Sequence, residues 1–175
     1  QGDGDLASIG AAEILHCANR GEKVSVVFVN NATYGMTGGQ MAPTTLPDQE
    51  TATSPAGRDV ESAGYPIRMA ELLATLRTPG FIARGAVHTP LHAIGAKALL
   101  RRAFRCQVEG RCFSLVEILA ICPTTWGLPP AEAARWLGQH MLPYYPLGVF
   151  KTPGGPDRAP APLGPLSCAG PGGGA

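Results

Sequence analysis

Two polar clusters in the sequence combine residue types and a spacing that suit a metal ion and a phosphorylated ligand. Residues 2–5 read Gly-Asp-Gly-Asp, and residues 30–31 are a pair of asparagines. An Asp carboxylate, an Asn carbonyl and nearby main-chain carbonyls are hard oxygen ligands that suit Mg²⁺, which in proteins usually also binds phosphate oxygens. Gly2 and Gly4 would allow the main chain to approach that phosphate closely. The clusters therefore predict a phosphorylated ligand bound through Mg²⁺.

The spacing of the two clusters predicts that they meet in space. Twenty-eight positions separate Asp3 from Asn31. The end of one strand, a crossover helix and the next strand occupy about that length, so both side chains would return to the same edge of a parallel sheet. At metal–oxygen distances of about 2.1 Å, their donor oxygens should lie on the order of 3–4 Å apart. The alternative is a surface Gly-Asp turn and an unrelated asparagine pair.

The pattern of apolar residues predicts the elements that carry these clusters. Residues 23–30 form a continuous apolar run rich in β-branched side chains, which is typical of a strand buried on both faces. Strands are predicted at residues 23–30, 81–87 and 113–120, and helices at residues 6–18, 65–76, 89–108 and 129–140. Gly21 should end the first helix, and Pro66 should lie in the first turn of the second. This alternation indicates an α/β fold, a parallel sheet with flanking helices.

The strand ends indicate where a ligand would bind, because ligands of such sheets lie at the carboxyl ends of the strands. Asn30 and Asn31 lie at the end of one predicted strand, and Cys122 lies just past another. Residues 30–64 form a long segment rich in Gly, Thr, Pro and Asn. A loop of that length inside a compact domain usually has a function.

Composition excludes several classes of protein. Lys and Arg number 14 against 13 Asp and Glu, and only 15% of residues are charged, which argues against nucleic-acid binding or an electrostatic membrane anchor. Hydrophobic residues reach 45%, too many for a disordered chain. No apolar run approaches the roughly 18 residues of a membrane-spanning helix. The odd count of 5 cysteines lacks disulfide-scaffold spacing, so we expect a reducing, cytoplasmic location.

The start of the chain gives one further expectation. The sequence opens at Gln1 without a Met, a basic region or an apolar signal region, and it begins directly on the Gly-Asp-Gly-Asp cluster. We therefore expect the chain to be an N-terminally truncated fragment of a longer protein.

Several segments resemble one family of enzymes. GDGDLASIG followed by NNATYGMTGGQMAPTT resembles the signature of proteins that bind thiamine diphosphate. More narrowly, the chain is similar to the β subunit of the 2-oxoacid:ferredoxin oxidoreductases, and GYPIRMAELLATL, FSLVEILAICPTTWG and PYYPLGVFK resemble later parts of that subunit. The resemblance covers residues 1–151, which would form a partial thiamine-diphosphate-binding domain, followed by a flexible tail at residues 152–175 with 7 Gly and 6 Pro.

The resemblance implies a role for each matching position. Asp3 through its carboxylate, Asn31 through its side chain and Thr33 through its main-chain carbonyl would bind Mg²⁺. The remaining expected contacts to the cofactor are Gly2, Gly4, Asp5, Tyr34, Gly35, Thr37, Gly38 and Gly39, with Met36 and Thr37 at its reactive thiazolium edge. Pyruvate-specific members usually carry an Asn where this chain has Met36. That difference favours branched-chain 2-oxoacids such as 2-oxoisovalerate, or 2-oxoglutarate, over pyruvate.

The resemblance also implies a reaction and partners. The 2-oxoacid would lose CO₂ and leave as an acyl-coenzyme A, with ferredoxin as the electron acceptor, in a complex with an α subunit and with γ and δ subunits. Two alternatives remain. A non-oxidative thiamine-diphosphate decarboxylase or synthase shares the GDG and the Asn pair but lacks the TGGQ and Cys-Pro strings, and a non-catalytic fragment would only pair with an α subunit.

Cys122 has two interpretations. A single cysteine after a buried strand is usually a small core residue. In the family, a cysteine in this Cys-Pro string binds a four-iron, four-sulfur cluster, together with cysteines upstream of the GDG that this sequence does not contain. Cys122 is therefore expected to bind the cluster only in the full-length subunit, and the fragment alone should be inactive.

Overall fold

The described part of the chain, residues 1–153 of this computed structural model, folds around a four-stranded sheet. Its strands are β1 (Ser25–Asn30), β2 (Phe81–Ala86), β3 (Ser114–Leu119) and β4 (Gly148–Lys151), in the spatial order β1-β3-β2-β4. The first three strands are parallel, and β4 is antiparallel to β2. The structure confirms the predicted α/β fold, a parallel sheet with flanking helices, and adds the antiparallel strand β4.

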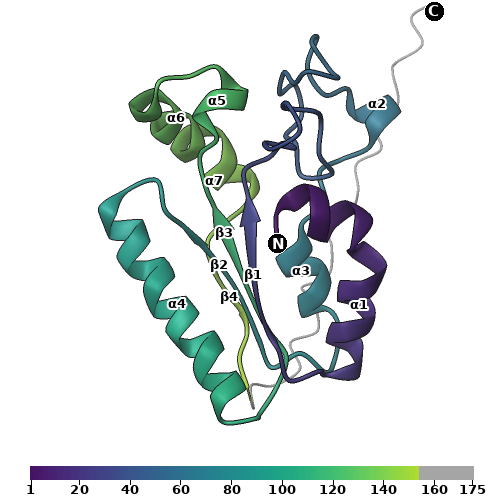
Figure 1. Cartoon of the computed structure of the whole chain (residues 1–175), viewed down its shortest axis with the longest axis vertical. Coiled ribbons are helices and arrows are strands. Elements are labelled where there is room, and N and C mark those ends of the chain that lie inside the picture. Colours follow the sequence, from purple (N-terminus) through teal and green to yellow (C-terminus); the bar gives the residue numbers. More distant parts are fainter. Residues whose placement is uncertain (154–175) are drawn as a thin grey trace, which may run out of the picture.

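Helices cover both faces of the sheet and explain why its inner strands are apolar. α1 (Ala11–Arg20) and α3 (Met69–Ala74) lie on one face, and α4 (Pro90–Val108) lies on the other (Figure 1). Every residue of β2 and β3 is buried. Leu115 of β3 packs into the core beneath α1 and α3, whereas Val116 packs into the core beneath α4. Both faces of β3 are therefore closed to solvent.

The first predicted helix is divided into two. The π-helix η1 (Asp5–Ile9) precedes α1, and the N–H of Gly10 at their junction donates to the carbonyl of Asp5 (2.7 Å). Gly21 ends α1 as predicted, in the left-handed conformation with φ of 72°. Asp5 therefore begins a helix two residues after the candidate metal ligand Asp3.

Other helices differ from prediction at their ends. α3 starts at Met69, so the expectation that Pro66 lies in its first turn is wrong. The N–H of Ile67 donates instead to the carbonyl of Pro43 in the long loop (2.9 Å). The helix predicted at residues 129–140 continues to Tyr144 and consists of α6 (Pro130–Trp136), η2 (Leu137–Met141) and α7 (Leu142–Tyr144). Two short helices are additional, α2 (Val60–Ala63) and α5 (Pro123–Trp126).

The long loop after β1 takes its shape from one buried arginine. Arg58 is 4% exposed, and burial lowers the pKa of its guanidinium. It donates hydrogen bonds of 2.9–3.2 Å to the main-chain carbonyls of five residues, Ala42, Pro43, Thr45, Ala63 and Gly64. The loop lies with α5, α6 and α7 at the carboxyl end of the sheet (Figure 1).

The described residues include the predicted domain but almost none of the predicted tail. The predicted domain, residues 1–151, lies entirely within them, whereas the predicted tail lies outside them except for Thr152 and Pro153. Among residues 1–153, no helix has both the length and the apolar character needed to cross a membrane.

Candidate functional site

The two predicted polar clusters meet at the carboxyl end of the sheet. Gly2 forms a parallel bridge with Val29 of β1, and the N–H of Val29 donates to the carbonyl of Gln1 (2.8 Å). Residues 1–2 therefore run beside the end of β1. This pairing places Asp3 next to Asn31, which directly follows β1.

Asp3 is a buried carboxylate, and within residues 1–153 its hydrogen-bond donors are neutral groups. Its Oδ1 accepts from the N–H of Gly4 (3.0 Å), and its Oδ2 accepts from the N–H of Thr33 (3.0 Å) and the hydroxyl of Thr44 (2.9 Å). Burial raises the pKa of Asp3, and these hydrogen bonds oppose that rise. Because a buried carboxylate is costly without a counter-charge, the environment of Asp3 favours a bound cation.

The Asp3 carboxylate, the Asn31 carboxamide and the Thr33 carbonyl lie next to one another and together form an oxygen cluster. The Asn31 carboxamide oxygen lies 3.2 Å from Asp3 Oδ2 and 2.7 Å from the Thr33 carbonyl oxygen. Turning the carboxamide over would replace the oxygen by its NH₂ group, which would donate to the same two atoms. The turned orientation satisfies both acceptors without a metal, whereas a metal bound at this point would favour the orientation in which the Asp3, Asn31 and Thr33 oxygens face one another. Their separations suit neighbouring ligands of Mg²⁺, whose bonds to oxygen are about 2.1 Å long.

The donor set also narrows the kind of metal. Within residues 1–153, no group of three or more His, Cys, Asp or Glu side chains is arranged to hold a metal ion. The candidate site consists of a carboxylate, an amide and a main-chain carbonyl. Such all-oxygen sets suit Mg²⁺ with additional oxygens from a phosphorylated ligand, and they do not suit Zn²⁺. The residues present fit the predicted metal.

A tight turn at residues 34–40 lies beside this oxygen cluster. The N–H of Tyr34 donates to the carbonyl of Gln40 (3.0 Å), and the N–H of Gly39 donates to the carbonyl of Tyr34 (2.8 Å). Gly38 and Gly39 have φ of 116° and 85°, which other residues rarely adopt. The ring of Tyr34 lies against Gly4, where an added Cβ would come within 2.2 Å of it. The turn and residues 2–5 are thus packed together.

Several predicted cofactor residues lie on this edge but away from the oxygen cluster. The side chain of Met36 is fully exposed. Thr37 is also exposed, and its hydroxyl donates to the side-chain carbonyl of Gln40 (2.6 Å). Gly2 and Asp5 are exposed, and an added Cβ on Gly2 would meet nothing within 4 Å. Their roles toward a cofactor stay predictions.

Cys122 lies at the predicted place, after β3 and beside the oxygen cluster. A Cβ added to Gly35 would be 3.2 Å from Cys122 Sγ and 3.4 Å from the Asn31 carboxamide nitrogen. The thiol is partly exposed. Trp126, in the helix that Cys122 precedes, donates its indole N–H to the carbonyl of Asn31 (3.1 Å). The role of Cys122 as an iron ligand stays a prediction.

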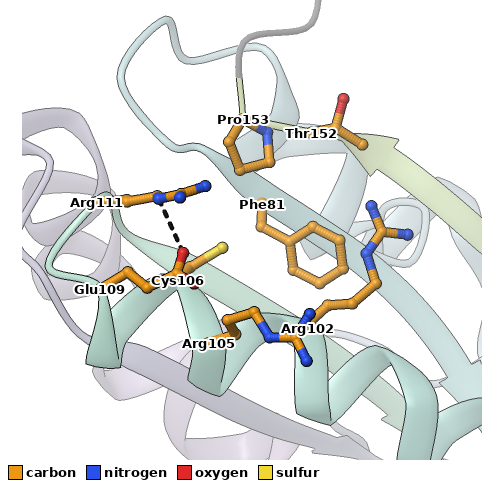
Figure 2. Close-up of a pocket in the computed structure, with 8 residues that line it drawn as sticks. All are labelled: Phe81, Arg102, Arg105, Cys106, Glu109, Arg111, Thr152 and Pro153. Atoms are coloured by element: carbon orange, nitrogen blue, oxygen red, sulfur yellow. Dashed lines mark ion pairs between the residues drawn. The ribbon is translucent and has the colours of Figure 1, made fainter.

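A cationic pocket lies at the opposite end of the sheet, near the start of β2 (Figure 2). Its volume is about 240 Å³, and the guanidinium carbon of Arg102 lies 4.9 Å from the centre of the Phe81 ring. Arg105 points along the same wall, and Arg111 is paired with Glu109 (2.8 Å). Because Phe81 begins β2 whereas the oxygen cluster follows the strand ends, this pocket is separate from the candidate site.

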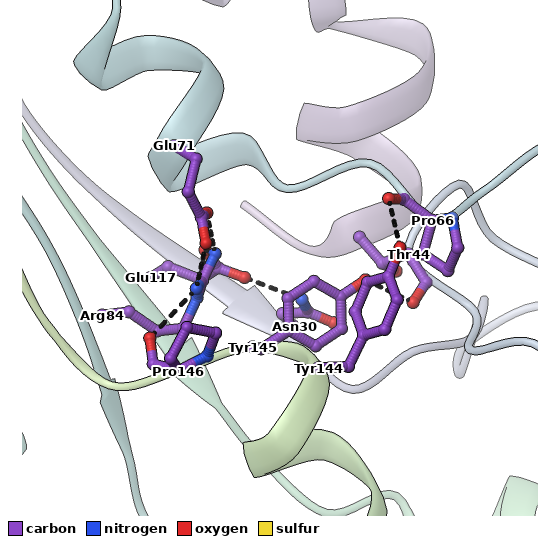
Figure 3. A network of polar contacts seen from close by, with 9 residues as sticks. All are labelled: Asn30, Thr44, Pro66, Glu71, Arg84, Glu117, Tyr144, Tyr145 and Pro146. Atoms are coloured by element: carbon purple, nitrogen blue, oxygen red, sulfur yellow. Dashed lines mark hydrogen bonds and ion pairs between the residues drawn. The ribbon is translucent and has the colours of Figure 1, made fainter. Parts of the chain in front are cut away.

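The sequence analysis missed a buried polar network behind the oxygen cluster. Arg84 of β2 and Glu117 of β3 are fully buried and form an ion pair of 2.8 Å (Figure 3). Glu117 also accepts a hydrogen bond from the Asn30 carboxamide (2.8 Å). The signal was present in the sequence, since each of these charged residues interrupts an otherwise apolar predicted strand. Thr44, the hydroxyl donor to Asp3, has no such signal.

The fold and site define an α/β domain with a candidate metal–phosphate site at the carboxyl ends of parallel strands. Residues 1–118 match the family described as thiamine pyrophosphate enzyme, C-terminal TPP binding domain. The chain belongs to this family.

Similar proteins extend the comparison. The chain is 48% identical over 151 residues to the ketoisovalerate oxidoreductase subunit VorA of Methanothermobacter thermautotrophicus, covering 86% of this chain and 32% of that subunit. It is 34% identical over 139 residues to the 2-oxoglutarate synthase subunit KorB of Archaeoglobus fulgidus, covering 79% and 48%. The chain thus spans less than half of these curated relatives. These similarities confirm the resemblance drawn from the sequence.

A solved structure supports the fold. The 2-oxoglutarate:ferredoxin oxidoreductase from Magnetococcus marinus, solved with 2-oxoglutarate, coenzyme A and succinyl-CoA bound, superposes with a TM-score of 0.63 at 23% identity. The match covers 89% of this chain and 56% of that one.

Proposed function

We propose that this chain binds thiamine diphosphate through Mg²⁺ and acts as the β subunit of an enzyme that oxidatively decarboxylates a 2-oxoacid. The products would be an acyl-coenzyme A and CO₂, with ferredoxin as the electron acceptor. The observation that carries the proposal is the placement of the Asn31 carboxamide within 3.2 Å of the buried Asp3 carboxylate and 2.7 Å of the Thr33 carbonyl, at the carboxyl end of the sheet, in a chain of the thiamine pyrophosphate family.

The residues at this edge would hold the metal and the diphosphate. The Asp3 carboxylate, the Asn31 carboxamide oxygen and the Thr33 carbonyl oxygen would bind Mg²⁺, and Thr44 keeps Asp3 oriented through its hydroxyl. Gly2 leaves open space in which a diphosphate can approach the main chain. When bound, thiamine diphosphate supplies the carbon that adds to the substrate carbonyl and the electron sink for decarboxylation.

The proposed substrates are branched-chain 2-oxoacids such as 2-oxoisovalerate, or 2-oxoglutarate. The names of the similar subunits, ketoisovalerate oxidoreductase and 2-oxoglutarate synthase, support this range. The residue type at Met36, whose side chain is fully exposed in this structure, is compatible with it, because a thioether could pack against a longer substrate chain but cannot donate the hydrogen bond of an amide. Catalytic efficiencies for 2-oxoisovalerate, 2-oxoglutarate and pyruvate test this choice, and a preference for pyruvate would contradict it.

The proposed partners are an α subunit, γ and δ subunits, ferredoxin and coenzyme A, in the cytoplasm. Similar proteins that are named as subunits of oxidoreductases support an assembly of this kind. In the full-length subunit, Cys122 would bind a four-iron, four-sulfur cluster, and its partly exposed thiol after β3 is compatible with that role.

Binding of thiamine diphosphate tests the proposal directly. The protein, purified with its accompanying subunits, should bind thiamine diphosphate by calorimetry in the presence of Mg²⁺, lose it in EDTA and regain it with added Mg²⁺. Asp3→Asn should raise the Kd at least about 10-fold, because it removes a charged metal ligand. Asp48→Asn is the matched control, since Asp48 is exposed and its positive φ of 58° suits asparagine equally. Absence of binding, or equal Kd values for the two variants, would refute the proposal.

A further inference from the structure

A buried charged network lies directly behind the oxygen cluster and joins three elements (Figure 3). Arg84 and Glu117 are opposite one another on β2 and β3, and Arg84 Nε donates to Glu117 Oε2 (2.8 Å). Arg84 also donates to Glu71 of α3 (2.9 Å) and to the carbonyl of Pro146 (3.1 Å). Burying such charges is costly, and apolar side chains could often fill the same space with no loss of stability. The network therefore calls for an explanation beyond stability.

The second carboxylate oxygen of Glu117, which does not contact Arg84, connects this network to the turn after β1. Glu117 Oε1 accepts from Asn30 Nδ2 (2.8 Å), and Asn30 Oδ1 accepts from the N–H of Ala32 (3.0 Å). Asn30 and Ala32 are both fully buried. The side chain of Asn30 thus links Glu117 of β3 to the main chain of the turn.

Ala32 is the strained residue of this turn. Its φ of 57° lies in the left-handed region, which costs roughly 1 kcal/mol or more for a residue with a Cβ. Beside the Asn30 contact to its N–H, its carbonyl accepts from the hydroxyl of Thr45 (2.7 Å) and the carboxamide of Gln49 (3.3 Å). Ala32 separates Asn31 from Thr33, so its conformation decides whether their oxygens face the same point.

We propose that Glu117 and Asn30 are positioning residues for the metal site. Glu117, fixed by Arg84 and Glu71, orients the Asn30 carboxamide, and Asn30 holds Ala32 in the left-handed conformation that turns the Asn31 and Thr33 oxygens toward Asp3. Neither residue would touch the metal. The inference rests on the proposed function, because it assigns these residues a role in the Mg²⁺-dependent binding of thiamine diphosphate.

A rescue experiment separates this role from a purely structural one. In Asn30→Ala, the left-handed conformation of Ala32 loses its support, so the half-saturating Mg²⁺ concentration at fixed thiamine diphosphate should rise about 10- to 100-fold, as for other residues that orient metal ligands. In the double variant Asn30→Ala with Ala32→Gly, the half-saturating Mg²⁺ concentration should return most of the way to the wild-type value, because glycine adopts positive φ without strain.

The measurement is a Mg²⁺ titration followed by calorimetry on the protein purified with its accompanying subunits, together with urea unfolding in EDTA. An unchanged Mg²⁺ requirement in Asn30→Ala, or a double variant that folds but shows no recovery, would overturn the inference. If Asn30→Ala does not fold, Glu117→Gln takes its place, since it keeps the side-chain shape but loses the charge that fixes it against Arg84. A normal Mg²⁺ requirement in Glu117→Gln would likewise overturn the inference. Wild-type protein that binds no thiamine diphosphate would instead refute the proposed function.

Discussion

Replacing Gly4 by alanine tests how residues 2–5 are packed against the turn at residues 34–40. A Cβ on Gly4 would lie 2.2 Å from both Cδ1 and Cε1 of the Tyr34 ring, whereas carbon atoms in contact are about 3.5–4.0 Å apart. Gly4 has φ of −68° and ψ of −27°, which alanine adopts without strain. The effect of the substitution is therefore a steric one, and the Tyr34 ring must move.

The size of the effect follows from the constraints on Tyr34. Its main chain is tied to Gln40 (3.0 Å) and Gly39 (2.8 Å), so the ring cannot move far without disturbing the turn. Overpacking of this kind costs about 1–3 kcal/mol. For a chain of 175 residues, each kcal/mol lowers the Tm by about 2–4 °C, so the Tm of Gly4→Ala should fall by about 2–12 °C.

Urea unfolding without cofactor provides the assay, and the same motif supplies the control. Gly2→Ala adds the same methyl group where nothing lies within 4 Å, so its free energy of unfolding should stay within about 0.5 kcal/mol of wild type. Combining Gly4→Ala with Tyr34→Ala should recover at least about 1 kcal/mol relative to additivity. Equal stabilities for Gly4→Ala and Gly2→Ala, or strict additivity in the double variant, would refute the reasoning.

Three further predictions concern other parts of the chain. Arg58→Met should lower the free energy of unfolding, measured in urea, by about 3 kcal/mol or more, because it leaves buried main-chain carbonyls without a hydrogen-bond donor. A loss below about 1 kcal/mol would contradict the role assigned to Arg58. Gly95→Ala should stabilise the protein by about 0.5–1 kcal/mol in the same assay, since Gly95 lies inside α4 with open space around its Cα; a destabilised variant would count against this. Burial raises the pKa of Cys112 to about 11, so its alkylation by iodoacetamide at pH 8 should be at least about 100-fold slower than that of an ordinary thiol. The alkylation rate should rise about 10-fold per pH unit, and rapid labelling at pH 7 would disprove the raised pKa.

The sequence predicts the inner strands well because burial on both faces leaves a simple pattern. The predicted strands at residues 23–30, 81–87 and 113–120 differ from β1, β2 and β3 by at most two positions at either end. The sequence does not predict β4, because a strand of four partly exposed residues is too short to show a pattern of alternating or continuous apolar residues. The start of α3 differs from the prediction because the N–H of Ile67, directly after Pro66, bonds to the carbonyl of the distant loop residue Pro43, which a local proline pattern does not reveal.

In the candidate site, too, residues that follow a local sequence pattern are predictable, whereas residues brought together by distant contacts are not. Asp3 and Asn31 could be paired from spacing, because 28 residues is about the length of a strand end, a crossover helix and the next strand. Thr44 could not, since it lies 41 positions from Asp3 in a loop without a periodic pattern. Glu117 is visible as a charge inside an apolar run, but its contact with Asn30 depends on the register between β1 and β3, which the sequence alone does not specify.

The strand order has a consequence for how the chain reaches this structure during synthesis. β1 and β2 are made first, yet they are not neighbours, and both pair with β3, whose first residue, Ser114, lies 89 positions after its partner Ser25. Until β3 emerges, two apolar runs lack their hydrogen-bonding partner, and exposed runs of this kind favour aggregation. Sheets closed by such distant pairings form slowly. Folding of this chain should therefore depend on protection of its N-terminal two-thirds until the central strand has been made.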